Sequence, residues 1–123
     1  MTSIKIKGLG GQGIKTIALI LAKILQDQKY YIILTLEYDA FVRQGQSCAS
    51  LIFSKNKIEN PITEHFDKEY DFNDPKIKNQ KSENMILLGM ILKDFNIKTT
   101  ALIKYLPQKQ KQENLKAIKI GLK

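Results

Sequence analysis

The spacing of hydrophobic residues changes along the chain, and each spacing predicts an element. Ser3–Lys7 is typical of a short strand, which ends at Gly8. Between residues 12 and 28 the apolar side chains recur every three or four positions, which predicts an amphipathic helix. Tyr30–Leu36 is apolar, β-branched and aromatic, so we expect a strand buried on both faces. This order predicts a β-α-β unit whose two strands are parallel.

The remaining two thirds of the chain have a different pattern. Ser47–Ser54 is predicted to be a third strand. The loop between the second and third strands is too short to hold a crossover helix. The third strand is therefore either antiparallel to the second or joined to it by a loop around the sheet edge. Residues 60–81 contain two prolines and few aliphatic side chains, which indicates a linker or extended loop. Helices are predicted near residues 82–95, 99–105 and 108–120, with Ser82 and Thr99 as N-caps. The first of these helices is apolar almost all round and should be buried.

Composition is that of one soluble globular domain, with 43% hydrophobic and 26% charged residues. The net charge of +8 raises the question of nucleic-acid binding. We do not favour it, because the charge is spread out and Arg43 is the only arginine among 20 basic residues. Residues 98–123 carry seven lysines and one acidic residue, which would suit an acidic protein partner.

Other single features favour a cytoplasmic protein without a metal site or a catalytic set of its own. No apolar run has the length of a membrane span, and the first residues do not resemble a signal peptide. The single cysteine, Cys48, lies in an apolar strand and is expected to be a buried core thiol. His65 has no second histidine or cysteine nearby, so we expect no metal site there.

The glycine-rich turn after the first strand is the clearest functional motif. Gly8, Gly10 and Gly13 have the spacing of the dinucleotide-binding fingerprint. Glycines let an anion approach the backbone, and the N–H groups of the following helix attract it. Glu37 or Asp39 could then bind a ribose hydroxyl. The alternative is a tight strand-to-helix turn without a ligand.

Two further features bear on this motif. The turn nearly matches a P-loop, but Ile14 is inserted before Lys15, and one residue turns a side chain by about 100° around a helix. Arg43 lies in the loop at the carboxyl end of the second strand, while the glycine turn follows the first. If the two strands are parallel neighbours, both features lie at one sheet edge, where α/β ligand sites form. The alternative for Arg43 is a solvated surface side chain.

Three stretches together resemble the gamma subunit, or gamma domain, of the thiamine-diphosphate-dependent 2-oxoacid:ferredoxin (or flavodoxin) oxidoreductases. The glycine turn with Gln12 inside it and the downstream Arg43-x-Gly45 are more specific than glycine spacing alone. The helices after residue 82 are also similar to the family's C-terminal helices. The resemblance rests on Ile6-Lys7-Gly8-Leu9-Gly10-Gly11-Gln12-Gly13-Ile14-Lys15-Thr16, on Tyr38-Asp39-Ala40-Phe41-Val42-Arg43-Gln44-Gly45-Gln46-Ser47-Cys48-Ala49, and on Ile52-Phe53-Ser54 with Ile58. The helical segments that agree with it are Asn84-Met85-Ile86-Leu87-Leu88-Gly89 and Glu113-Asn114-Leu115-Lys116-Ala117.

The chain departs from the family pattern in two places. Gln44 and Asp39 stand where the family commonly has glycine, so the loop is less open to a ligand. Some twenty polar residues also replace the family's further strands and helices. The expected fold is α/β: a Rossmann-like three-layer α/β/α domain with a reduced, mostly parallel or mixed sheet. Residues 1–123 would form a single gamma-type domain, with 1–61 as the ligand half, 62–81 as a linker and 82–123 as C-terminal helices.

The resemblance implies a place in an enzyme complex that oxidatively decarboxylates a 2-oxoacid with coenzyme A. Alpha and beta subunits, with or without a delta subunit, would be the partners, and ferredoxin or flavodoxin would accept electrons indirectly. Thiamine diphosphate and iron–sulfur clusters would reside in those partners, since one cysteine cannot ligate a cluster. The phosphate groups of coenzyme A would be bound by Gly10, Gly11, Gln12, Gly13 and Arg43. The alternatives are a free-standing nucleotide-binding module, with Glu37 or Asp39 on a ribose, and an inactive truncated scaffold.

Overall fold

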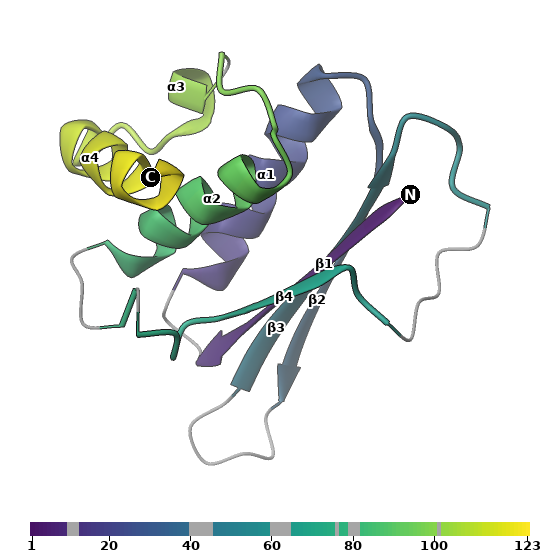
Figure 1. The fold of residues 1–123 in the computed structure, drawn as a ribbon, viewed down its shortest axis with the longest axis horizontal. Helices are drawn as coiled ribbons and strands as arrows, with labels where there is room; N and C mark the ends of the chain where they lie inside the picture. The colour runs from purple at the N-terminus through teal and green to yellow at the C-terminus, as the bar shows by residue number, and fades with distance from the viewer. Residues whose placement is uncertain (10–12, 40–45, 60–64, 76, 79–81, 101) are drawn as a thin grey trace.

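The computed structural model describes residues 1–9, 13–39, 46–59, 65–75, 77–78, 82–100 and 102–123 (Figure 1). Strands and helices alternate at first, and the last third of the chain is helical. The elements are β1 (Thr2–Leu9), α1 (Ile14–Asp27), β2 (Tyr31–Asp39), β3 (Gln46–Ser54), β4 (Lys68–Asp71), α2 (Glu83–Asp94), α3 (Leu102–Tyr105) and α4 (Lys111–Leu122).

The four strands form one mixed sheet in the order β2-β3-β1-β4. Strand β3 pairs antiparallel with both β1 and β2, and β4 pairs parallel with β1. Strands β1 and β2 therefore run in the same direction, as the β-α-β pattern predicts, but β3 lies between them. Strands β1 and β2 are thus not neighbours, because the β2–β3 hairpin folds back and inserts β3 beside β1.

Strand β2 is an edge strand, and the prediction that it is buried on both faces is wrong. Ile32 and Leu34 face the helices and are half-buried, while Tyr31 and Leu36 are exposed. An apolar run indicates a buried strand only when neighbours cover it, and β2 has a strand neighbour on one side alone among the described residues.

Residues 62–81, predicted to be a linker, contain strand β4. Only Tyr70 among its four residues is buried, so neither length nor alternation signals a strand in the sequence. Its start is held against β1 by a pair of hydrogen bonds. The Ser3 backbone N–H donates to the Asp67 carboxylate over 2.8 Å, and the Asp67 N–H donates to the Ser3 hydroxyl over 3.1 Å. A short strand of weak propensity is thus fixed by contacts distant in sequence.

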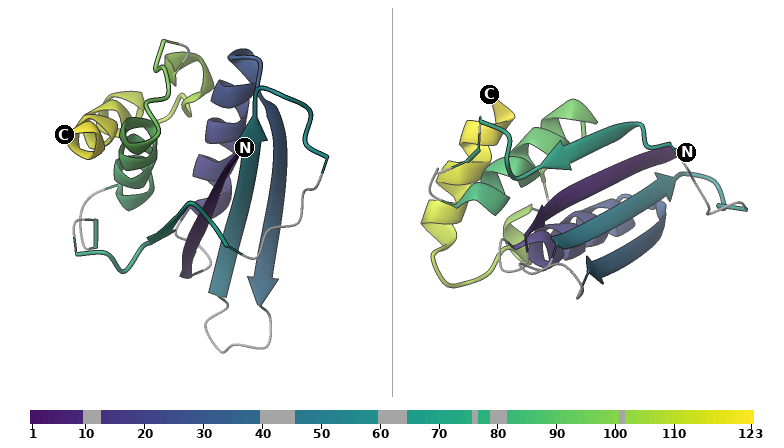
Figure 2. Two further views of the ribbon diagram at one scale, coloured as in Figure 1. Left: turned by 45° about the vertical axis from the view of Figure 1, so that its right-hand side comes forward. Right: turned by 90° about the horizontal axis from the view of Figure 1, so that it is seen from below.

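The described helices gather on one face of the sheet, with α1 directly against it and α2 and α4 beyond (Figures 1 and 2). This arrangement confirms the predicted α/β class with a mixed sheet, and its described part has two layers. The core lies between the layers. Its sheet side comprises Ile4, Ile6, Ala49, Leu51, Phe53 and Tyr70.

Helix α2 is buried nearly all round, as its sequence predicts, because α1 lies on one side and α4 on the other. It crosses α4 at two glycines. A Cβ atom on Gly89 would lie 2.3 Å from the Ile118 carbonyl oxygen, and one on Gly121 would lie 2.1 Å from the Ile86 carbonyl oxygen. The two backbones therefore touch at a distance that no larger residue permits.

The predicted cap of α2 is correct in position and wrong in chemistry. Ser82 precedes the helix, but it has a φ of 60° and its side chain makes no capping hydrogen bond. Its carbonyl oxygen accepts the N–H groups of Met85 and Ile86 at 3.0 and 3.2 Å, as the carbonyl of an N-cap residue does with or without a side-chain cap. Thr99 likewise precedes α3, and its carbonyl oxygen accepts the Leu102 N–H at 3.1 Å.

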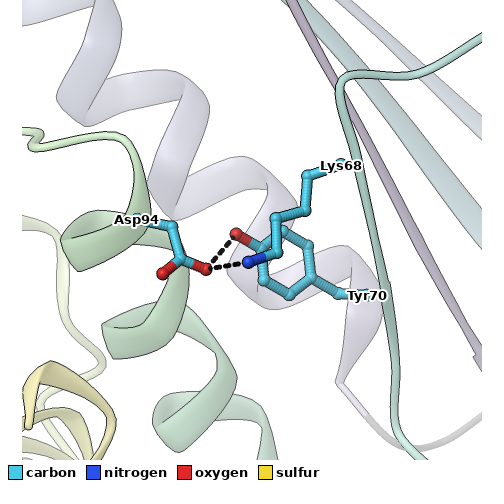
Figure 3. Close-up of polar contacts among 3 residues, drawn as sticks. All are labelled: Lys68, Tyr70 and Asp94. Atoms are coloured by element: carbon cyan, nitrogen blue, oxygen red, sulfur yellow. Dashed lines mark hydrogen bonds and ion pairs between the residues drawn. The ribbon is translucent and has the colours of Figure 1, made fainter.

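The far end of α2 is tied to β4 by one carboxylate. Asp94 accepts hydrogen bonds from the Tyr70 hydroxyl and from Lys68 Nζ, each at 2.8 Å (Figure 3). Burial alone would raise the pKa of Asp94, but these hydrogen bonds outweigh it and hold that pKa below its usual value. Burial first, and then the bond to Asp94, raise the pKa of Tyr70 far above its ordinary range. The hydrogen bonds of Asp94 with Lys68 and Tyr70 thus stabilise the contact between β4 and α2.

We predict that Gly89→Ala lowers the free energy of unfolding by about 2 kcal/mol or more, because the added methyl group overlaps the α4 backbone. Alanine favours an ordinary helix by about 1 kcal/mol over glycine, so a loss has to come from this contact. Urea unfolding followed by circular dichroism measures it. Lys116→Ala, on the exposed face of α4, is the control and should change little. A Gly89→Ala protein as stable as the wild type would contradict the close crossing.

We predict that Asp94→Asn lowers the free energy of unfolding by about 1 kcal/mol at pH 7, because Lys68 and Tyr70 lose their hydrogen bonds to a charged carboxylate. The pKa of Asp94 is depressed in the folded state. Its stabilisation is therefore present above the unfolded pKa of about 3.9 and is lost as pH falls through the folded value. Urea unfolding at several pH values should show the gap between the two proteins closing in acid. Exposed Glu59→Gln is the control, and a gap independent of pH would contradict the assignment.

Candidate functional site

The glycine turn connects the carboxyl end of β1 to the start of α1. Gly8 pairs with Ser47 in β3, and Gly13 is the N-cap of α1. Gly13 has φ 86° and ψ 21°, the left-handed conformation that glycine adopts without steric cost. The other predicted ligands, Gly10, Gly11, Gln12 and Arg43, lie outside the described residues. The structure thus shows both ends of the predicted site and leaves its centre a prediction.

Asn84 is a neighbour of the turn that the sequence did not indicate as part of the site. A Cβ atom on Gly13 would lie 2.5 Å from the Asn84 side-chain nitrogen. Asn84 belongs to the first turn of α2, and its side-chain oxygen accepts the Met85 N–H at 3.0 Å. The N-termini of α1 and α2 therefore meet at Gly13. Sequence reasoning could not find this contact, because it joins residues 71 positions apart (84 − 13).

The N-terminus of α1 is the better anion site of the two. Gly13 offers no side-chain cap, and the first turn of α1 holds no acidic residue. Its N–H groups and helix dipole are thus available to a negatively charged ligand. The first turn of α2 contains Glu83, whose negative charge already complements the dipole of α2. Lys15 and Thr16, on the first turn of α1, are exposed.

The register of the sheet aligns the strand ends that adjoin the glycine turn and the segment containing Arg43 in the sequence. Leu9 pairs with Gln46, and Gln46 pairs with Asp39. Leu9, Asp39 and Gln46, the described residues that adjoin the two segments in the sequence, therefore lie at one edge of the sheet, although β3 separates β1 from β2. That the glycine turn and Arg43 share a site stays a prediction.

The alternative ribose ligands are less well placed. In a dinucleotide fold the acidic residue ends the strand next to the glycine turn. Here Glu37 is exposed on β2, pairs with Cys48, and is separated from β1 by β3. The Asp39 backbone ends β2, and its side chain lies outside the described part. This sheet order favours a phosphate contact at the glycine turn over recognition of a neighbouring ribose.

Cys48 is half-buried on the sheet face away from the helices, so its prediction as a buried core thiol is wrong. Its strand alternates between faces, and Ala49, its neighbour, occupies the core side. Burial raises the pKa of this thiol, Lys5 lowers it, Glu37 raises it, and the net direction is upward. A raised pKa keeps the thiol protonated at neutral pH, which disfavours a nucleophilic role.

The described residues contain no group of three or more His, Cys, Asp or Glu side chains arranged to hold a metal ion. None of the helices in the described ranges has the length and apolar character needed to cross a membrane.

Comparison with known proteins places the chain among oxidoreductase components. Residues 3–73 match the family model for pyruvate ferredoxin/flavodoxin oxidoreductase. This stretch covers more than half of the chain and includes the glycine turn, the β2–β3 hairpin and β4. No protein of curated function matches the sequence.

Three solved structures share the fold. The gamma subunit of a keto/oxoacid ferredoxin oxidoreductase from Geobacter sulfurreducens matches at a TM-score of 0.69 and 15% identity, over 98% of this chain and 96% of that one. Pyruvate oxidoreductase subunit PORC from Thermotoga maritima matches at a TM-score of 0.68 and 18% identity, over 98% of this chain and 94% of that one. The third structure is the 2-oxoglutarate:ferredoxin oxidoreductase from Magnetococcus marinus with 2-oxoglutarate, coenzyme A and succinyl-CoA bound. It matches at a TM-score of 0.73 and 17% identity, over 98% of this chain and 30% of that chain.

We predict that Gly13→Ala lowers the free energy of unfolding by about 1–2 kcal/mol, because alanine is strained at positive φ and its methyl group overlaps Asn84. Asn84→Ala in the same chain removes the overlap and should recover part of the loss. Thermal unfolding of both single variants and the double variant separates the two causes. Strictly additive effects would contradict the contact between Gly13 and Asn84.

Proposed function

Because this chain belongs to the pyruvate ferredoxin/flavodoxin oxidoreductase family, we propose that it acts as the gamma subunit of a 2-oxoacid:ferredoxin or flavodoxin oxidoreductase. The match over residues 3–73 carries this proposal, since it contains the glycine turn and the strands that position it. The shared fold with gamma-type structures over 98% of the chain supports it. The complex would reside in the cytoplasm and assemble with alpha and beta subunits, with or without a delta subunit.

The proposed role of this chain within the complex is to hold coenzyme A. The uncapped N-terminus of α1, free of acidic side chains, fits a phosphate group. Gly10, Gly11, Gln12 and Gly13 would surround one phosphate with backbone N–H groups, and Arg43 would pair with a second. Coenzyme A supplies the thiol that accepts the acyl group of the decarboxylated 2-oxoacid. The relative from Magnetococcus marinus was determined with coenzyme A bound, which is consistent with this proposal.

The chemistry of decarboxylation and electron transfer would take place in the partner subunits. This chain has one cysteine, and iron–sulfur clusters need several. Thiamine diphosphate would likewise be bound by a partner, and ferredoxin or flavodoxin would meet the complex there. The residues of this chain would bind and orient one substrate and contribute surface to the assembly.

Assembly is the first test. We expect the chain to copurify with alpha and beta subunits encoded in the same genome when the three are co-expressed and the tag is placed on a partner. Co-expression with an unrelated tagged protein is the control. A chain that never enters the complex would contradict the gamma-subunit role, and binding of NAD by the isolated chain in saturation-transfer NMR would favour the nucleotide-binding module.

Coenzyme A binding is the second part of the same experiment. In isothermal titration of the assembled complex, we expect Arg43→Ala to weaken coenzyme A binding by about 10- to 100-fold, since a charged hydrogen bond to phosphate contributes about 1.5–3 kcal/mol. Lys57→Ala removes one exposed positive charge elsewhere and serves as the control. An Arg43→Ala complex that binds as tightly as the wild type removes Arg43 from the site. Full oxidoreductase activity without this chain would favour the inactive scaffold.

A further inference from the structure

The two edges of the sheet differ in the way they meet solvent. Strand β4 is four residues long, and its exposed side chains, Lys68, Glu69 and Asp71, are all charged. Short, charged edges resist pairing with other strands. Strand β2 is nine residues long and has no charged residue before Glu37. The β2 edge therefore has the length and the apolar character of a strand that accepts a further strand.

Exposed hydrophobic side chains concentrate beside this edge. Tyr31 and Leu36 of β2 are 54% and 44% exposed, and Leu19 of α1 is 39% exposed. These three are half of the six large hydrophobic residues described as exposed. A groove of about 490 Å³ lies between α1 and β2, with Leu19, Ala22 and Gln26 on one side and Tyr31 and Ile32 on the other. Apolar surface gathered in this way is typical of a binding face.

The charges at the ends of β2 are opposite. Lys29 precedes the strand and Glu37 lies near its end, and both are exposed. A second β2 strand placed antiparallel would bring the positive end of one against the negative end of the other. A parallel strand would bring like charges together. The edge is thus complementary to itself in one direction, and the antiparallel arrangement closes as a two-fold dimer.

We propose that a second copy of this chain pairs with β2 in an antiparallel register centred on Ile33, and so forms a continuous sheet across two copies. In this register Ile32 lies opposite Leu34, and the turn that carries Lys29 lies at the same end of the contact as Glu37 of the other copy. The groove residues Tyr31 and Ile32 of each copy lie two and one positions from the centre of the contact. This pairing also satisfies outward backbone N–H and carbonyl groups of β2 that the described residues leave without a strand partner.

Sedimentation equilibrium of the full chain in about 0.15 M salt tests the proposal. We expect the wild type to sediment at twice the chain mass of 14.1 kDa. Tyr31→Lys should raise the dissociation constant at least tenfold. Ile103→Lys on α3 is the matched control, because Ile103 is also 54% exposed, and it should leave the dimer unchanged. A wild-type monomer at about 100 μM, or equal effects of the two variants, would overturn the proposal.

A charge exchange tests the register. Lys29→Glu and Glu37→Lys, each alone, should raise the dissociation constant several-fold, because each places like charges together at two symmetric positions. The double variant should return towards the wild-type value. A double variant weaker than both single variants would rule out this register. Far-ultraviolet circular dichroism of every variant separates a loss of pairing from a loss of folding.

The remaining possible occupant is a strand of another subunit. Hydrogen exchange of the β2 amides distinguishes a strand of another subunit from a second copy of this chain. Protection that rises with the concentration of the isolated chain supports the second copy. A monomeric chain whose β2 amides become protected only in the assembled complex would overturn the dimer and assign the edge to a partner. Coenzyme A titration is independent of this surface, so failure of the dimer leaves the proposed function standing.

Discussion

Helix α2 is held at both ends and along one face, and the rest of the structure depends on these contacts. Its first turn touches Gly13 through Asn84, its last residue binds β4 through Asp94, and its middle touches α4 at Gly89. These contacts place the glycine turn, the edge strand β4 and the C-terminal helices relative to one another. A movement of α2 along its axis would disturb all three, so the candidate ligand site is connected mechanically to the helical layer.

The candidate site combines features that sequence alone could locate with others that it could not. The amphipathic period of α1 is a local pattern, and it specified the helix. The common direction of β1 and β2 followed from the β-α-β pattern. The neighbour of the turn, Asn84, depends on packing between distant helices, and no local pattern encodes it. The family resemblance agreed with the matched family model because it rested on combined motifs.

The errors have physical causes of the same kind. Strand β4 has one buried side chain, so its formation depends on hydrogen bonds to β1 and on the Tyr70–Asp94 contact. Strand β2 is apolar enough for a central strand, yet the hairpin places it at the edge. Ser82 has the residue type of an N-cap, but its backbone is left-handed, with a φ of 60°, and its side chain makes no capping hydrogen bond. For the two strands, tertiary contacts decided what local preference left open.

Strand β1 has a consequence for the order of folding. Its partners, β3 and β4, begin more than forty and sixty residues later, whereas β2 and β3 form a hairpin of neighbouring strands. Local pairing is fast and distant pairing is slow. Strand β1 is therefore synthesised before both of its partners and is enclosed only once they pair with it. Until β4 forms, Ile4 and Ile6 of β1 lack a complete core, so the incompletely folded chain exposes apolar surface at this segment.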